Sequence, residues 1–187
     1  SRECGPSTGC HMISDIFRER VLAAGGGAVV LAGSGSDEKH IDKIVASLIE
    51  EGVPNDVRIA SAHKHAAYGK VGRLIKEYDT MRQPLCYVLD AGETDALSGT
   101  AGWLTNRPCI SCPPDHPNVS CLTNPPGSSN IYLGSPEAVG PYVAKTLEYT
   151  RRSVKPSVIV LGKIPEHSDK IHEIAADIQE YGIEAHS

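Results

Sequence analysis

The stretch that decides the fold is Ala28-Val29-Val30-Leu31-Ala32, which runs directly into Gly33-Ser34-Gly35-Ser36-Asp37. An uninterrupted apolar run of this kind is typical of a strand that is buried on both faces, as strands of parallel sheets are. The polar turn leads into residues 40–51, where apolar side chains recur at helical spacing. A buried strand, a polar turn and an amphipathic helix form the repeating unit of α/β proteins.

The same alternation continues along the chain. Further strands are predicted over 56–60, 85–89 and 108–111, and further helices over 66–78 and from Ser135 to about Arg152. We interpret Gly25-Gly26-Gly27 as a flexible lead-in and residues 90–99 as a loop. Strands that alternate with helices predict a parallel sheet with helices on both faces, and the loops that follow its strands should meet at one edge.

Three segments are expected along the chain. Residues 1–12 are rich in Gly, Ser, Pro and Cys, and we interpret them as a tag or disordered leader outside the fold. Residues 13–152 should form the main domain. Residues 153–187 should form an extra strand–helix unit, with a strand over 158–161 and a helix over 169–180. Its apolar positions match those of the first unit but its polar turn does not, so it is either the start of a second repeat or a C-terminal packing extension.

Composition excludes several functional classes. The 187 residues carry a formal net charge of -5, which argues against the basic surface of non-specific nucleic-acid binders. No apolar run is long enough to span a membrane and no secretory signal is present, so we expect a cytoplasmic protein. Cys109 and Cys112 have C-x-x-C spacing. Because a second pair with metal-ligand spacing is missing, we expect reduced structural thiols and no bound metal.

Two polar loops carry candidate chemistry, and the first is the turn at 33–37. Glycines such as Gly33 let the backbone approach a ligand closely, and the free N–H groups at a helix start attract an anion. Ser34 and Ser36 add hydroxyl donors, and Asp37 can accept hydrogen bonds from sugar hydroxyls. The alternative is a plain turn in which Asp37 is the N-cap of the helix.

The second loop is Ser61-Ala62-His63-Lys64, which follows the next predicted strand. Lys64 offers a positive charge for a phosphate, Ser61 offers a donor, and an imidazole such as His63 can exchange protons near neutral pH. The alternative for His63 is a structural role. His40 and His65 are weaker candidates, as solvent-facing or packing residues.

Taken together, these motifs resemble the aminoimidazole ribonucleotide carboxylase family. The first loop, the histidine three residues after it, and the second loop occur here in the order and spacing typical of that family. Lys64 after His63 is similar to the class II branch, which uses carbon dioxide directly. Three more stretches resemble class II loops, and the resemblance covers about Ala28 to Leu147: Ala96-Leu97-Ser98-Gly99, Ile110-Ser111-Cys112-Pro113-Pro114 and Ser135-Pro136-Glu137.

The resemblance implies a three-layer α/β/α sandwich with a parallel, flavodoxin-like sheet, and a homo-oligomer, a tetramer or an octamer. It implies carboxylation of 5-aminoimidazole ribonucleotide with CO2 to 4-carboxy-5-aminoimidazole ribonucleotide, in purine biosynthesis, without metal or cofactor. His63 would move the proton of the reacting carbon. The implied substrate contacts lie in three loops. Ser34, Ser61 and Lys64 would bind the phosphate, and Ser36 and Asp37 the ribose. The loops from Ala91 and from Cys112 would enclose CO2, and the remaining implied substrate contacts are Gly33, Ala91, Gly92, Ser98 and Gly99.

The chain departs from the class II pattern in the loop at 91–95. Glu93 and Asp95 stand where the branch usually has arginine and asparagine. Carboxylates near an anionic nucleotide are unfavourable unless they are protonated, turned outward, or paired with a cation such as Lys64 or Arg107. Two alternatives therefore stay open: a repurposed or catalytically silent domain that binds another phosphorylated ligand, and a non-catalytic partner domain.

Overall fold

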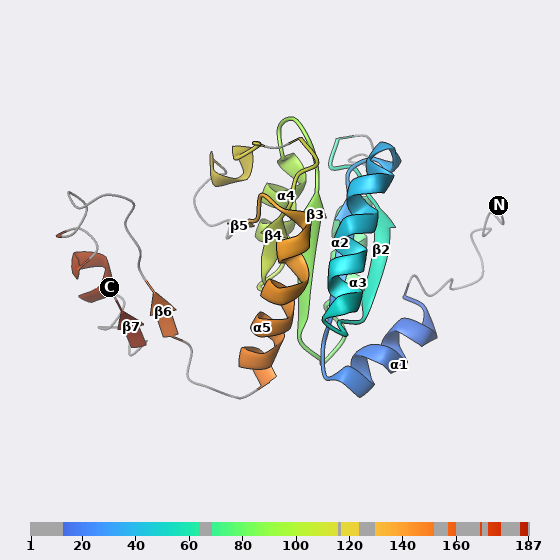
Figure 1. Ribbon diagram of the computed structural model, residues 1–187, viewed down its shortest axis with the longest axis horizontal. Helices are drawn as coiled ribbons and strands as arrows, with labels where there is room; N and C mark the ends of the chain where they lie inside the picture. The colour runs from blue at the N-terminus through green and yellow to red at the C-terminus, as the bar shows by residue number, and fades with distance from the viewer. Residues whose placement is uncertain are drawn as a thin grey trace. The chain divides into compact units, whose positions relative to one another are not determined.

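Figure 1 shows the computed structural model of the protein. It describes residues 13–63, 69–115, 117–123, 130–151, 157–159, 169, 172–176 and 184–186. The chain divides into two compact units, Ser1–Glu148 and Tyr149–Ser187. Each unit has its own sheet.

The first unit is built on a parallel 5-stranded sheet. Its strands are β1 (Gly27–Ala32), β2 (Asn55–Ile59), β3 (Leu85–Asp90), β4 (Cys109–Ser111) and β5 (Asn130–Tyr132). Their spatial order is β2-β1-β3-β4-β5, which is the flavodoxin-like order. The predicted parallel, flavodoxin-like sheet is confirmed.

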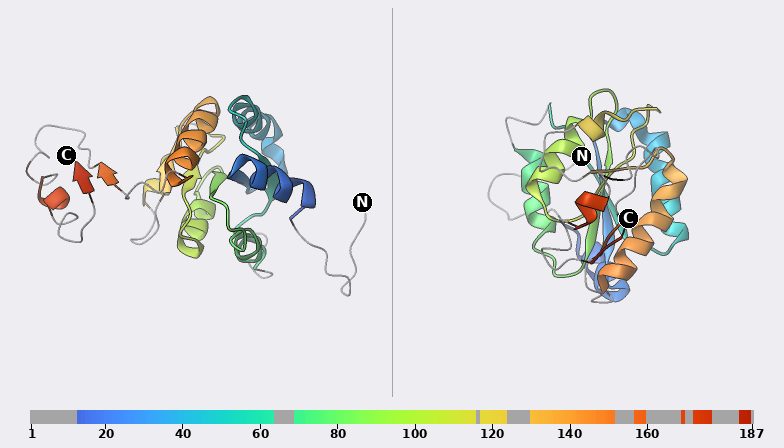
Figure 2. Two further views of the ribbon diagram at one scale, coloured as in Figure 1. Left: turned by 90° about the horizontal axis from the view of Figure 1, so that it is seen from below. Right: turned by 90° about the vertical axis from the view of Figure 1, so that its left-hand side faces the viewer.

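Helices cover both faces of this sheet. They are α1 (Asp15–Ala24), α2 (Glu38–Glu50), α3 (Lys70–Tyr78), α4 (Ala96–Leu104) and α5 (Val139–Arg151), with short 3-10 turns η1 (Gly35–Asp37), η3 (Ser120–Thr123) and η4 (Pro136–Ala138). The right-hand view of Figure 2 shows the sheet between α2 and α5 on one side and α3 and α4 on the other. The predicted three-layer α/β/α sandwich is therefore present.

Strand β1 explains why the apolar run at its centre is uninterrupted. Val29 and Leu31 pack into the core cluster that α1, α3 and α4 cover, whereas Ala28 and Val30 pack into the cluster that α2 and α5 cover. All residues of β1 are buried because both faces of the strand contact helices. A strand with one face in water would alternate apolar and polar residues instead.

The start of the first unit differs from the sequence expectation. Residues 15–24 form α1, whose N-cap Ser14 accepts a hydrogen bond from the Phe17 N–H. The helix ends at Gly25, which adopts φ 72° and donates its N–H to Leu22 O. Only glycine enters this left-handed region readily. The interpretation of Gly25-Gly26-Gly27 as a flexible lead-in was wrong, because Gly25 caps α1 and Gly27 is already part of β1.

Two further elements of the first unit, besides α1, were not predicted. Helix α4 lies partly inside the stretch interpreted as a loop, 90–99, and continues to Leu104. Its sequence is rich in small and apolar residues and shows no clear polar face, so the periodic signal of an amphipathic helix is missing. Strand β5 has 3 residues and completes the sheet beside β4. A strand this short carries almost no pattern.

The second unit contains β6 (Ser157–Ile159), which pairs in parallel with β7 (Glu184–His186). Residues 172–176 between them are helical, and Ala175 is buried. The described parts of the predicted strand and helix thus have the expected secondary structure, and β7 was not predicted. Whether this unit is a second repeat or a packing extension stays a prediction, as do the boundaries at 12 and 152.

Helices α2 and α5 are in close contact where Gly140 meets Ser47. The Ser47 hydroxyl donates to Glu137 O at 2.8 Å, and the Gly140 N–H donates to the Ser47 Oγ, also at 2.8 Å. A Cβ atom at Gly140 would overlap the backbone oxygen of Ser47. The absence of a side chain at position 140 therefore sets how closely α5 packs on α2.

We expect Gly140→Ala to lower the free energy of unfolding by about 3 kcal/mol or more, because only a shift of the backbone relieves the overlap. Urea unfolding followed by circular dichroism measures it. Gly72→Ala in α3 is the matched control, since the nearest atom to a new Cβ there is 3.8 Å away. That variant should gain about 0.5–1 kcal/mol, because alanine favours helix more than glycine does. Equal losses in both variants would contradict the steric explanation.

Candidate functional site

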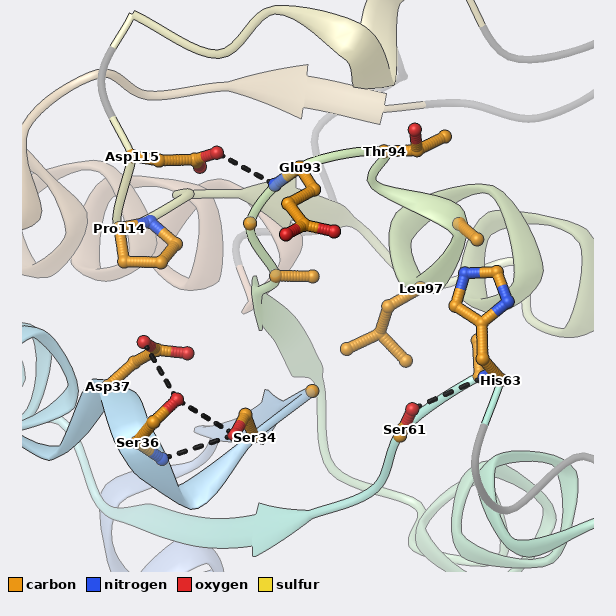
Figure 3. Close-up of a pocket in the computed structure, with 15 residues that line it drawn as sticks. Ser34, Ser36, Asp37, Ser61, His63, Glu93, Thr94, Leu97, Pro114 and Asp115 are labelled. Atoms are coloured by element: carbon orange, nitrogen blue, oxygen red, sulfur yellow. Dashed lines mark hydrogen bonds between the residues drawn. The ribbon is translucent and has the colours of Figure 1, made fainter.

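The site lies where the order of the strands reverses, between β1 and β3. In open α/β sheets the loops after two such strands leave in opposite directions and open a crevice at their carboxyl ends. The Gly33 N–H donates to Asp90 O at 2.8 Å, which holds the beginnings of the two loops together. Figure 3 shows the resulting cavity, whose volume is about 390 Å³. Ligand pockets typically start at about 300 Å³.

Loops that follow four strands line this cavity. The lining residues are Gly33, Ser34, Ser36, Asp37, Ser61, Ala62, His63, Ala91, Gly92, Glu93, Thr94, Ala96, Leu97, Pro114 and Asp115. Most of the residues that the sequence analysis selected are among them. The structure thus brings these residues together from separate parts of the chain, while their roles toward a substrate stay predictions.

Two selected residues do not line the cavity, and a third lies outside the described residues. Ser98 is fully buried in the first turn of α4, where its hydroxyl donates to Asp95 O at 3.2 Å. Gly99 follows it inside the same helix and is also absent from the lining. Lys64 lies outside the described residues, as does His65.

The loop after β1 is organised by its own hydroxyl groups. The Ser34 Oγ accepts the Ser36 N–H at 3.2 Å and lies 2.8 Å from the Ser36 Oγ, which can donate to it. The Ser36 hydroxyl has a second acceptor in Asp37 Oδ1, at 3.2 Å. Asp37 occupies the N-cap position of α2 but makes no capping hydrogen bond. Its carboxylate is therefore oriented along the cavity wall rather than into the helix end (Figure 3).

The loop after β2 contributes Ser61 and His63. The Ser61 Oγ accepts the His63 N–H at 3.3 Å, which fixes the direction in which the chain leaves the strand. Both side chains line the cavity opposite the loop after β3 (Figure 3). A hydroxyl and an imidazole thus face the same space as the Ser34 and Ser36 hydroxyls.

The loop after β3 holds Glu93 in an unusual conformation. Glu93 has φ 58° and is the one non-glycine residue with positive φ in the described part of the chain. Its N–H donates to Asp115 Oδ2 at 2.7 Å, and its carbonyl accepts the Asn118 Nδ2–H at 2.8 Å. Figure 3 shows its carboxylate pointing into the cavity. Glu93 is therefore not turned outward.

Asp115 anchors this conformation from the loop after β4. Besides the Glu93 N–H, it accepts the Asn118 Nδ2–H at 2.9 Å. Partial burial raises the pKa of the Asp115 carboxyl, but the hydrogen bonds from Asn118 and Glu93 outweigh it and hold the pKa below its usual value. Asp115 therefore acts as an ionised acceptor at neutral pH.

Asp95, the second unusual carboxylate in the sequence, has a structural role. It is almost completely buried and caps α4, accepting the Ser98 N–H at 2.9 Å, and it also accepts the Ser111 hydroxyl. It is not part of the cavity lining. Arg107, which the sequence suggested as a partner for these carboxylates, instead pairs with Asp79 at 2.8 Å.

Sequence reasoning missed Asp90, the last residue of β3. Its side chain is 0% exposed, and neither carboxylate oxygen has a hydrogen-bond partner among the described residues. His40 Nε2 lies 3.9 Å from Asp90 Oδ1, and this nitrogen also donates to Cys112 O at 3.1 Å. Burial, and then the charges of Asp37, Asp95 and Asp115, raise the pKa of Asp90 to about 7. The sequence signal that could have identified Asp90 is an acidic residue directly after the apolar strand predicted over 85–89.

The described cysteines are buried free thiols: Cys86, Cys109, Cys112 and Cys121. Burial raises the pKa of Cys86, Cys109 and Cys112 to about 12, so these three are protonated near neutral pH. Within the described residues no group of His, Cys, Asp and Glu side chains could hold a metal ion. The same part of the chain has no helix that is long and apolar enough to cross a membrane.

We expect Asp90→Asn to stabilise the protein increasingly as pH rises. The folded protein binds the Asp90 proton more tightly than the unfolded chain does. This protonation contributes fully to the free energy of unfolding below about pH 4, and the contribution is lost as pH rises toward 7 and the buried carboxyl ionises. The variant should match the wild type near pH 4 and exceed it by about 4 kcal/mol near pH 8. Urea unfolding at several pH values measures this difference. Asp42→Asn, an exposed position on α2, is the control, and a difference that is independent of pH would contradict the prediction.

Replacing Glu93 should reveal the strain at its backbone. We expect Glu93→Gly to raise the free energy of unfolding by about 1 kcal/mol, because a Cβ is unfavourable in the left-handed region. Glu93→Ala keeps the Cβ and should show no such gain. Thermal and urea unfolding of both variants test this, and equal stability of the two would show that the conformation is not strained.

Comparisons with known proteins agree with this architecture. The AIR carboxylase family model matches residues 28–138, a range that contains every loop lining the cavity. The phosphoribosylaminoimidazole carboxylase of Treponema denticola is 31% identical over 136 residues, covering 70% of this chain and 84% of that protein. The bifunctional phosphoribosylaminoimidazole carboxylase/phosphoribosylaminoimidazole succinocarboxamide synthetase of Drosophila melanogaster is 34% identical over 125 residues, covering 64% of this chain and 29% of that protein.

A solved structure is also similar. The crystal structure of Treponema denticola PurE superposes with a TM-score of 0.60 at 25% sequence identity, covering 83% of this chain and 94% of that one. Sequence and structure therefore agree on one relationship: the chain belongs to the AIR carboxylase family.

Proposed function

We propose that this protein carboxylates 5-aminoimidazole ribonucleotide with CO2 to form 4-carboxy-5-aminoimidazole ribonucleotide, a step of purine biosynthesis. The observation that carries the proposal is the cavity at the β1/β3 crevice. It joins the hydroxyl-rich loop at 33–37 to Ser61 and His63, in a chain of the AIR carboxylase family. Its volume of about 390 Å³ suits a mononucleotide.

The phosphate and ribose belong at the loops after β1 and β2. Ser34, Ser61 and Lys64 would bind the phosphate, helped by the positive end of the α2 dipole. The Ser36 hydroxyl and the Asp37 carboxylate would bind the ribose hydroxyls. Among the described residues, the Ser36 hydroxyl forms hydrogen bonds only within its own loop, to Ser34 or Asp37. It can therefore turn to a ligand without breaking contacts to the core.

The chemical step requires positioning and one proton transfer. The exocyclic amine of the substrate makes the neighbouring imidazole carbon, C4, an enamine-like nucleophile. C4 forms a bond to the carbon of CO2, and the electron pair of one C=O bond moves to oxygen. C4 then carries both hydrogen and carboxylate. His63 takes that proton and the ring regains its aromatic electrons, so substrate and CO2 yield product and one proton.

Apolar groups in the cavity lining favour this step. They are contributed by Ala91, Ala96, Leu97 and Pro114, and they leave CO2 fewer competing water molecules than a fully polar lining would. The predicted contacts of Gly92, Ser98 and Gly99 with the substrate remain part of the proposal. Neither a metal nor a cofactor takes part in the proposed reaction.

We further propose that the protein is a cytoplasmic homo-oligomer, a tetramer or an octamer. Trp103 is 73% exposed at the end of α4, and Leu104 beside it is exposed as well. Large apolar side chains at one surface position favour contact with another chain. The buried free thiols suit a reducing compartment.

A second candidate function follows from Glu93. A carboxylate that points into a nucleotide cavity also suits a repurposed or catalytically silent domain that binds another phosphorylated ligand. A non-catalytic partner domain is the remaining alternative. Turnover distinguishes these possibilities from the carboxylase.

The test is carboxylation of 5-aminoimidazole ribonucleotide by the purified full chain in bicarbonate buffer, followed by ultraviolet absorbance. We expect turnover by the wild type and a loss of about 10²–10⁴-fold or more in His63→Asn, because the variant lacks the proton acceptor. Calorimetry should show that the variant binds the nucleotide nearly as well as the wild type. Absence of turnover in folded wild-type protein would overturn the carboxylase assignment, and full activity of His63→Asn would remove His63 from the mechanism.

A further inference from the structure

The described residues that line the cavity include more acidic than basic side chains. Asp37, Glu93 and Asp115 line it, and His63 is the one side chain among the described lining residues that can become cationic. Asp37 lies with the serines of the first loop, and Asp115 is hydrogen-bonded to Asn118 and the Glu93 N–H. The carboxylate of Glu93, by contrast, makes no hydrogen bond or ion pair among the described residues while it points into the cavity (Figure 3). Within the described part of the chain, this carboxylate is therefore an acceptor without a donor.

The surrounding loops hold Glu93 in this place despite its backbone conformation. Asp115 fixes its N–H, and Asn118 and the Ser120 hydroxyl, at 2.8 and 3.3 Å, both donate to its carbonyl. These bonds maintain φ 58°, a region that glycine would occupy without strain. A strained non-glycine residue at a cavity points to a requirement for its side chain.

The position of Glu93 determines which part of the ligand it meets. If the proposed function holds, the loops after β1 and β2 take the phosphate and ribose. The base then reaches the opposite end of the cavity, where Glu93, Leu97 and Pro114 lie. Substrate and product share the exocyclic amine, which is a hydrogen-bond donor. They differ in the carboxylate that the product carries on C4.

We propose that Glu93 determines the ligand specificity of this cavity, accepting a hydrogen bond from the amine of the base and disfavouring the carboxylated product. This inference rests on the proposed function. Two carboxylates brought together in a partly enclosed cavity repel each other, and the described lining offers only the His63 imidazole to compensate. The solution equilibrium of the reaction is unchanged, but the bound nucleotide is shifted toward the uncarboxylated form, and product leaves readily.

The experiment compares ligands that differ in one charge. Binding is measured by calorimetry near pH 8 in His63→Asn, so that substrate and product do not interconvert. The probes are 5-aminoimidazole ribonucleotide, its 4-carboxylate, and the neutral 4-carboxamide, which has nearly the shape of the carboxylate. We expect the uncarboxylated nucleotide to bind at least about tenfold more tightly than the carboxylate, with the carboxamide close to the former.

Adding Glu93→Gln to the His63→Asn protein should reduce this preference by about tenfold, mainly through tighter binding of the carboxylate. Asp95→Asn is the matched control: it removes a charge two positions away whose side chain caps α4 outside the cavity, and it should leave the preference unchanged. Glu93→Gly, in which strain at position 93 is absent, provides a second variant if the glutamine substitution impairs folding.

The outcomes separate this inference from the proposed function. Equal or tighter binding of the carboxylate in His63→Asn, or a preference that Glu93→Gln and Glu93→Gly leave intact, would overturn the role of Glu93 while the carboxylase assignment stands. If the wild type shows no turnover and none of the three nucleotides binds, the proposed function fails and this inference fails with it.

Discussion

The parallel pairing of β1 with β2 on one side and β3 on the other is the constraint on which the site depends. The register sets Ala32 opposite both Ile59 and Asp90, so the three strands end at the same level. Hydrogen bonds from the Gly33 N–H to Asp90 O and from the Ala60 N–H to Ala32 O continue the ladder past the strand ends. The loops that follow therefore start side by side. A shift in register would separate the serines after β1 from Ser61 and His63.

Three carboxylates near this edge show how strongly local structure determines the effect of a charge. Asp95 is buried but accepts hydrogen bonds from the Ser98 N–H and the Ser111 hydroxyl, so it stabilises the start of α4. Asp90 is equally buried but has no hydrogen-bond partner among the described residues, and its pKa rises to about 7. Glu93 faces the cavity and is available to a ligand. The three carboxylates lie within one short stretch of chain but behave differently, because they differ in burial, in hydrogen bonding and in access to solvent.

Two unfavourable features lie at this edge of the sheet. One is the strained backbone of Glu93, and the other is the buried carboxylate of Asp90, which has no hydrogen-bond partner among the described residues. Each lowers the free energy of unfolding. A loss of even a few kcal/mol is a large fraction of the total, because the net free energy of unfolding of a domain is only about 5–15 kcal/mol. The remainder of the first unit is well packed, with apolar clusters on both faces of the sheet. Unfavourable local features that gather at one cavity are typical of functional sites, where binding sets requirements that folding alone does not. The acidic lining of the cavity fits this view.

The sequence by itself determined the fold class and most of the cavity. The apolar run at 28–32 requires helices on both faces of the sheet, and the polar loops after β1 and β2 must meet because parallel strands end at one edge. Helix α4 and strand β5 were decided by tertiary contacts, since an apolar helix lacks a periodic signal and a short strand lacks length. Tertiary structure also decided the different environments of Asp90, Glu93 and Asp95. Sequence gives the charge of these residues, but hydrogen-bond partners and burial depend on distant residues such as Ser111, Asp115 and His40.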